Sequence, residues 1–429
     1  MSALSGREVR RTRAGRVEEV TCHGVAHGGE AVARLADGRV VFIPFAVPGE
    51  RVRIRVVEDR RRFARAELEE VLEASPDRID PACPHFGPGR CGGCAWQHLR
   101  PEAQAELKAR LVREQLAHLG GLPDVPVRTA LRPHEPGDPG QPEGFGYRER
   151  ATLTAARDGR LGFLRASSHE VHPVDHCPLL AGGLRELPGQ LGRHPPGAKV
   201  RLRRGAAGER LVVLEAAAAS RTRLLAPDGV SWAIVRGSGK IVEGEGAPFV
   251  TERVAGVELH VSAASFFQVH RAGAEVLVDL VGQALEPASG EVLLDLYAGV
   301  GLFAATVGAR AGRVVAVESW KPAVRDARRN LRNHRDATVL QDDVANALPS
   351  LRAADVAVLD PPRAGAGATV LERLAALAPR AVALVSCDPA ALARDVRILT
   401  DLGYHTAWVQ PVDLFPQTAH VEAVTALYR

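Results

Sequence analysis

The feature that most constrains the fold is a repeat of short apolar strands and helical segments that begins near residue 262. The strand-like segments are VLLDLYAGVG, VVAVES, ATVLQDD, DVAVLDPP and AVALVSC, and KPAVRDARRNLRNH between two of them has helical spacing. This alternation is typical of a parallel, doubly wound sheet with helices on both faces. The last two apolar segments, YHTAWVQPVDLF and VEAVTALYR, have no helix between them. We therefore expect them to form an antiparallel pair at one edge of the sheet.

Four consecutive strands of this repeat end in carboxylates, which are Asp295, Glu318, Asp342–Asp343 and Asp360. The glycines of the YAGVG turn let a ligand approach the backbone closely, and an acid after the second strand can accept hydrogen bonds from ribose hydroxyls. The third-strand pair is placed for a contact with a base edge. Because the glycine spacing is not G-x-G-x-x-G, a dinucleotide site is disfavoured. The set resembles the class I methyltransferases that use S-adenosylmethionine (SAM).

Cys387, in VSCDPAALARD, ends the strand that follows the one carrying Asp360. Both side chains should face the crevice at the carboxyl edge of the sheet. Methyl transfer to an amine needs no thiol, whereas carbon 5 of a pyrimidine becomes nucleophilic when a thiolate adds to carbon 6. The alternative is a packed strand-end cysteine. Glu422, in the closing strand, is the candidate base, since a desolvated carboxylate has a raised pKa; an acid facing solvent is the alternative.

Two further units precede this region. Residues from about 14 to 72 alternate in β-rich segments between glycine turns. This pattern predicts a small OB-like barrel, a common scaffold for single-stranded nucleic acid, with an SH3-like interaction module as the alternative. An α+β unit follows, with a helix from Pro101 to Leu119 and a Pro- and Gly-rich loop from Pro133 to Gly144. We place the domains at 10–73, 74–261 and 262–429. Arginine clusters at 51–55, 60–65 and 201–204 allow a polyanionic partner, although solvated faces explain each cluster equally well.

Five segments resemble, in order and spacing, the RNA uracil-5 methyltransferases, which form 5-methyluridine. They are SFFQVH, DLYAGVG, DPPRAG, SCDPAALARD and DLFPQTAHVEAV. The resemblance implies a TRAM domain at the N-terminus and a Rossmann-like SAM domain at the C-terminus. It further implies Cys387 as nucleophile, Glu422 as general base, and a cofactor and target-base set of Gln268, Tyr297, Glu318, Asp343 and Asp360. The chain departs from the family at His270, Ala298 and Asp388, where Asn, Cys and Asn are frequent.

Four other cysteines suggest a metal site. Cys83, Cys91 and Cys94 have the spacing C-x7-C-x2-C, and Cys177 follows later in the central unit. Four thiolates suit either tetrahedral zinc or a 4Fe–4S cluster, and unligated thiols are the third alternative. The resemblance favours a 4Fe–4S cluster, with a first loop longer than the family's commonest form. Cys22 is expected to be an ordinary barrel residue.

Composition adds limits on location and partner. The basic N-terminus has no apolar segment behind it, and no apolar run approaches the ~18 residues of a membrane span. We therefore expect a cytoplasmic protein, without a membrane partner, that acts as a monomer. The resemblance favours ribosomal RNA as the substrate, on the joint presence of the TRAM-like domain and the cysteine motif, and transfer RNA is the second candidate. RNA cytosine-5 methylation and a non-catalytic RNA-binding factor are weaker alternatives.

Overall fold

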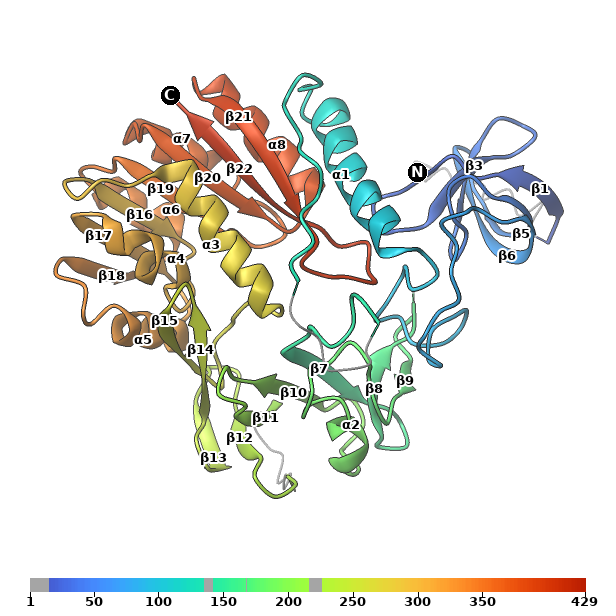
Figure 1. Cartoon of the computed structure of the whole chain (residues 1–429), viewed down its shortest axis with the longest axis horizontal. Coiled ribbons are helices and arrows are strands. Elements are labelled where there is room, and N and C mark those ends of the chain that lie inside the picture. The colour runs from blue at the N-terminus through green and yellow to red at the C-terminus, as the bar shows by residue number, and fades with distance from the viewer. Residues whose placement is uncertain (1–14, 135–141, 167, 216–225) are drawn as a thin grey trace, which may run out of the picture.

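The computed structural model describes residues 15–134, 142–166, 168–215 and 226–429. Residues 10–14 of the expected N-terminal domain and residues 135–141 of the expected loop lie outside these ranges. Figure 1 shows a β-rich unit at the N-terminus, a central sheet below it, and a layered α/β unit at the C-terminus. Within the described ranges, no helix is long and apolar enough to cross a bilayer.

The N-terminal unit is a six-stranded sheet with the order β1-β5-β6-β4-β3-β2. Its strands are β1 (Val17–Thr21), β2 (Gly24–Val25), β3 (Ala31–Arg34), β4 (Val40–Ile43), β5 (Arg51–Asp59) and β6 (Phe63–Glu73). Alternation in β5 buries Val52, Ile54 and Val56 in the barrel core, which also contains Cys22. The arginines on the other face of β5 pair with glutamates of β1 and β6. This cluster is therefore locally neutralised and is not a free cationic surface.

The central sheet has seven strands in the order β13-β12-β11-β10-β7-β8-β9. They are β7 (Arg150–Ala155), β8 (Leu161–Leu164), β9 (Val171–Pro173), β10 (Lys199–Arg204), β11 (Arg210–Glu215), β12 (Ser231–Val235) and β13 (Ile241–Glu245). The short helix α2 (Leu187–Gln190) packs beside β8. The apolar side chains of the central unit form a separate core around Leu153, Val200 and Leu202.

The C-terminal sheet confirms the predicted doubly wound architecture, with the order β18-β17-β16-β19-β20-β22-β21. Its strands are β16 (Val292–Leu296), β17 (Arg313–Glu318), β18 (Ala337–Gln341), β19 (Val356–Leu359), β20 (Ala381–Ser386), β21 (His405–Val412) and β22 (Glu422–Tyr428). Strands β16 to β20 are parallel to one another, and β22 is antiparallel to both β20 and β21. The expected antiparallel edge pair is thereby confirmed.

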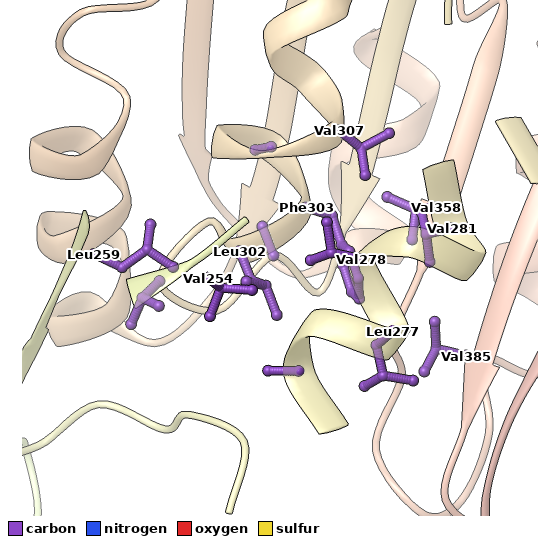
Figure 2. Packing of buried hydrophobic residues seen from close by; sticks show 14 of the residues in the cluster. Val254, Leu259, Leu277, Val278, Val281, Leu302, Phe303, Val307, Val358 and Val385 are labelled. Atoms are coloured by element: carbon purple, nitrogen blue, oxygen red, sulfur yellow. The ribbon is translucent and has the colours of Figure 1, made fainter. Parts of the chain in front are cut away.

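Helices cover both faces of this sheet. They are α3 (Arg271–Leu285), α4 (Leu302–Ala305), η1 (Val307–Arg310), α5 (Lys321–Asn330), α6 (Val344–Ala347), η2 (Leu348–Ser350), α7 (Ala368–Ala376) and α8 (Pro389–Asp401). Figure 2 shows Leu277, Val278 and Val281 of α3 against α4, Val358 and Val385. The hairpin of β14 (Phe249–Val254) and β15 (Val257–Ser262) joins this core through Val254 and Leu259. Fully buried strands explain why these segments read as continuous apolar runs.

One helix from the first half of the chain also packs on the C-terminal unit. Helix α1 (Pro101–His118) lies against α8 and β21, and Lys108 within it is buried in an ion pair with Asp413. Asp413 begins the loop between β21 and β22, which reaches toward the centre of the molecule between α1 and β7 (Figure 1). Breaking a buried pair leaves an uncompensated charge, at a cost of about 3–5 kcal/mol. The pair therefore fixes one end of the loop that leads to Glu422.

Candidate active site

The turn after β16 has an unusual backbone. Tyr297, Gly299 and Gly301 have positive φ angles of 62°, 56° and 84°. Glycine adopts this conformation freely, but a tyrosine in it costs on the order of 1–3 kcal/mol and is held there by its surroundings. Burial, reinforced by the negative charges of Asp343 and Asp395, raises the pKa of Tyr297 to about 12. The ring is therefore neutral and lies within electrostatic reach of Asp343.

Glu318 holds this turn against the end of β17. Its Oε2 atom accepts a hydrogen bond from the Gly299 amide at 2.9 Å, and its Oε1 atom accepts one from the Trp320 amide at 2.6 Å. A cavity of about 440 Å³ lies over Gly299, Glu318 and Trp320, with Phe266 also in its wall. The carboxylate thus faces a space that a ribose could occupy, as predicted for an acid at this strand end.

Asp343 has a local structural task as well as a place at the crevice. Its Oδ1 atom accepts a hydrogen bond from the Ala345 amide at 2.9 Å and so caps α6. A capping aspartate satisfies a helix amide that would otherwise be unpaired. Asp343 lies close to the turn that follows β16, because the amide of the preceding residue, Asp342, donates a hydrogen bond to the Glu318 carbonyl at 3.2 Å.

Asp295 lies within electrostatic reach of two other acids, Asp360 and Glu318, at the carboxyl edge. Asp360 accepts a hydrogen bond from Gln268 Nε2 at 3.4 Å, and burial raises its pKa to about 7. Burial raises the pKa of Asp295 to about 8, and the negative charges of Asp360 and Glu318 add to the rise. Asp295 Oδ2 accepts from the Ala304 amide at 2.9 Å, while Oδ1 has no hydrogen-bond partner in the described part of the chain. These groups favour a nearby positive charge.

Cys387 follows β20 and is half-buried. Ser386 pairs with Ala423 across β20 and β22, which sets Cys387 opposite Glu422. Burial, together with the negative charges of Glu422 and Asp360 and against the positive charge of Arg363, raises the pKa of the thiol to about 11. Asp388 caps α8 by accepting from the Ala391 amide at 2.8 Å. Asp388 is therefore the N-cap of α8, which begins at Pro389.

Glu422 is buried, with 3% of its surface exposed. Desolvation raises its pKa well above the ordinary range, the negative charge of Asp360 adds to this, and the Arg363 guanidinium opposes it. Its Oε1 atom has no hydrogen-bond partner among the residues that the structure describes. The interpretation of Glu422 as a solvent-facing acid therefore does not fit, whereas a base that awaits a substrate does.

The thiol opens onto a cavity of about 200 Å³. Its walls come from three distant segments: residues 92–95, residues 418–421, and the turn with His27 and Gly28. Arg363 and His420 also line it, and burial together with the positive charge of Arg363 lowers the pKa of His420 to about 4. Sequence reasoning missed both histidines. His420 could have been found from its place two residues before Glu422, but nothing in the sequence connects His27 with Cys387.

The departure at His270 has a structural explanation. Its Nδ1 atom accepts a hydrogen bond from the Gly273 amide at 3.2 Å, so the imidazole caps α3. The ring also stacks on Tyr147 with 5.0 Å between ring centroids. An asparagine could provide the same cap, so the departure preserves the entry into α3 that follows Gln268.

The four remaining candidate metal ligands line one cavity; they are Cys83, Cys91, Cys94 and Cys177. Burial raises the pKa of Cys91 to about 11 and that of Cys94 to about 12, and the neighbouring thiols contribute to both. The donor set therefore suits a thiophilic metal group. Across the described ranges, however, no three or more potential ligands are arranged to hold a metal ion. The structure brings the four cysteines to one cavity, and the 4Fe–4S cluster stays a prediction.

Comparisons with known proteins bear on the N- and C-terminal units. The TRAM domain model matches residues 11–68, and the model described as the methyltransferase small domain matches residues 268–384. A Streptomyces avermitilis protein named as an RNA methyltransferase is 42% identical over an alignment of 422 residues, and the match covers 95% of this chain and 97% of the relative. One from Gloeobacter violaceus, with the same kind of name, is 35% identical and covers 97% of both chains.

A solved structure extends the likeness to the whole fold. The crystal structure of the Pyrococcus abyssi tRNA (uracil-54, C5)-methyltransferase, in complex with S-adenosyl-L-homocysteine, superimposes with a TM-score of 0.74. The two sequences are 26% identical, and the match covers 96% of this chain and 100% of the other. The match therefore includes the N-terminal, central and C-terminal units.

Proposed function

Because the chain belongs to the RNA uracil-5 methyltransferase family, we propose that it methylates carbon 5 of a uridine in RNA through a covalent bond to Cys387. It is a SAM-dependent RNA methyltransferase; the target atom and the covalent step are the proposed part. The observation that carries the proposal is the thiol of Cys387 facing an open cavity beside two buried carboxyls, Asp360 and Glu422. A methyl transfer to nitrogen or oxygen would not need this arrangement.

The reaction begins with the thiol. Sulfur bonds to carbon 6 of the uracil, and the electron pair of the 5,6 double bond moves onto carbon 5 and O4 as an enolate. SAM would supply the methyl group to carbon 5 and leave as S-adenosylhomocysteine, and while bound its sulfonium would add positive charge. A thiol with a pKa of about 11 is protonated at neutral pH, so formation of the thiolate relies on positive charge nearby. The chain provides that charge through Arg363, which lowers the pKa of the thiol.

Glu422 completes the reaction. After methyl transfer, carbon 5 carries both a methyl group and a proton, and Glu422 removes the proton. The electrons of the C–H bond restore the double bond between carbons 5 and 6 as the carbon–sulfur bond breaks and the thiolate leaves. A carboxylate whose pKa burial has raised is a stronger base than one in water once it is ionised. The missing hydrogen-bond partner at Oε1 is consistent with this task.

The cofactor would lie along the carboxyl edge. We assign the ribose hydroxyls to Glu318 and the adenine edge to Asp343, with Tyr297 forming part of the wall. Gln268 and Asp360, which already share a hydrogen bond, would contact the methyl-bearing end and the target base. Support comes from the cavity over Gly299 and Glu318 and from the buried acids next to it.

The RNA must present the uridine unstacked, since carbon 6 is inaccessible inside a helix. We propose ribosomal RNA as the substrate, on the joint presence of a TRAM-like unit and the cysteine motif. Transfer RNA is the second candidate, because the Pyrococcus abyssi enzyme of similar fold is a tRNA methyltransferase. Mass spectrometry of nucleosides from both RNA classes of a deletion strain separates the two, since the true substrate loses its 5-methyluridine.

We further propose that Cys83, Cys91, Cys94 and Cys177 hold a 4Fe–4S cluster with a structural or RNA-orienting task. Support comes from their common cavity and from the mutual electrostatic effect of their thiols. Iron and sulfide analysis of anaerobically purified protein tests this, with zinc as the alternative result.

The reaction itself is tested with the full-length chain, RNA and SAM labelled in its methyl group. Digestion to nucleosides should give the label in 5-methyluridine, and the Cys387→Ala variant should transfer none. Label in 5-methylcytidine would replace the uracil proposal with the cytosine one. Transfer by Cys387→Ala at the wild-type rate would remove the covalent step.

A further inference from the structure

The cavity beside Cys387 has one wall from the opposite end of the chain. His27 and Gly28, in the turn between β2 and β3, line it together with Cys387 and Asp388. At about 200 Å³ the cavity far exceeds the ~15 Å³ that one water needs. The N-terminal unit is therefore part of the space in which the proposed reaction occurs.

The turn is held tightly in this place. Trp96 Nε1 donates a hydrogen bond to the Gly29 carbonyl at 2.9 Å, and the Ala95 and Trp96 amides both donate to the Gln417 carbonyl at 3.0 Å. A Cβ atom on Gly29 would lie 2.7 Å from Ala419 Cβ, closer than real contacts allow. Three segments thus meet in one packed junction, and the turn is not a freely moving arm.

His27 is directed at the neighbour of the nucleophile. Its Nε2 atom lies 3.3 Å from Asp388 Oδ2, while Asp388 Oδ1 caps α8. The His27 side chain is still 49% exposed, so the ring has an open side toward the cavity. Arg363 and His420 line the same cavity, which gives it three nitrogen-bearing side chains and a single carboxylate, Asp388.

We propose that His27 binds the sugar–phosphate backbone of the target nucleotide, and that the turn from His27 to Gly29 is a wall of its pocket. Nitrogen donors next to an exposed cavity are the groups that bind phosphate and ribose oxygens in RNA. Asp388 orients the imidazole, and the junction with Trp96 and Ala419 holds it in reach. This inference rests on the proposed function, because it assumes that a nucleotide enters this cavity.

The test measures kcat and KM for RNA in the full-length His27→Ala variant. Loss of one hydrogen bond to a charged group should raise the RNA KM about tenfold, with kcat and the SAM KM little changed. His27→Gln, which retains a donor, should recover part of the loss. His23→Ala is the matched control, since His23 is exposed in the same unit and does not line the cavity.

A second pair of variants tests the wall. Gly29→Ala adds the clash with Ala419, whereas Gly38→Ala adds a methyl group at a similar positive φ, +85°, with no atom within 4 Å. Both variants have the same kind of backbone strain. Only Gly29→Ala should therefore raise the KM for RNA by more than its loss of thermal stability explains. If His27→Ala matches His23→Ala and Gly29→Ala matches Gly38→Ala, the inference is wrong. If the wild-type chain methylates no RNA, the proposed function has failed instead.

Discussion

The molecule holds thiols in two contrasting places, the carboxyl edge of the C-terminal sheet and the cavity of the central unit. Burial raises the pKa of Cys387 and of Cys94 alike, to about 11 and about 12. Their neighbours differ: Cys387 faces Glu422, Asp360 and Arg363, whereas Cys94 faces other thiols. A raised pKa therefore says little about a cysteine's task, and the charged groups around it say more.

The two places also share a wall. Gly93 and Cys94 line both the cysteine cavity and the cavity of Cys387. A change in the first can therefore be transmitted to the second through one short loop. Replacing the cysteines of each cavity shows which property of the protein those thiols control.

The largest effect is expected from Cys387→Ala. If Cys387 forms the proposed covalent bond, its loss should lower the rate of RNA methylation by roughly a thousandfold or more. Cys22→Ala is the control, since Cys22 is buried in the barrel core with a pKa of about 12 and faces no cavity of the site. Single-turnover assays at saturating SAM measure both. Equal rates for the two variants would show that methylation depends no more on Cys387 than on a buried thiol of the barrel core.

Glu422→Gln comes next. Without a base the adduct should form and persist, so that product release falls by about a hundredfold or more and the RNA-linked protein appears as a slower band on a denaturing gel. Glu252→Gln is the matched control, because Glu252 is a buried acid with a pKa of about 8 that lies in β14. Rapid turnover by the Glu422 variant without any adduct would contradict its assigned role.

A smaller effect, of a different kind, should follow from the double change Cys91→Ser and Cys177→Ser. If these thiols are ligands, the variant should lose its metal, and its free energy of unfolding should fall by roughly 2 kcal/mol or more. Once folded, it should retain chemistry at Cys387. Metal analysis and denaturant titration measure this, and a loss of activity greater than the loss of folded protein would show that the shared wall couples the two cavities.

The smallest effect concerns pH. Asp295 has a pKa of about 8 when folded and ~3.9 when unfolded, so the folded state holds the proton more tightly. Its contribution is fully present below pH 4 and is lost as the pH rises toward 8. From pH 6 to pH 7 the SAM-free protein should lose up to about 1.4 kcal/mol of stability that Asp295→Asn retains. Glu291→Gln should leave the slope unchanged, since Glu291, with a pKa of about 2, stays ionised.

The sequence predicted the local elements of the C-terminal unit well, because apolar strands with carboxylate ends have a strong pattern. The doubly wound sheet and the antiparallel edge pair are both confirmed. It could not predict contacts between units. Helix α1 packs on α8 rather than on the central sheet, and His27 reaches Asp388. Such contacts depend on side-chain complementarity between segments hundreds of residues apart, which no periodicity records.

The contact between Gly29 and Ala419 has a consequence for the synthesis of the protein on the ribosome. A ribosome adds about 5–20 residues per second, and 390 positions separate these two residues. The turn is therefore made roughly 20 to 80 seconds before the loop that completes its pocket. Contacts of such long range close slowly and late in folding. A nascent chain therefore cannot complete the cavity beside Cys387 until nearly all of its residues have been made.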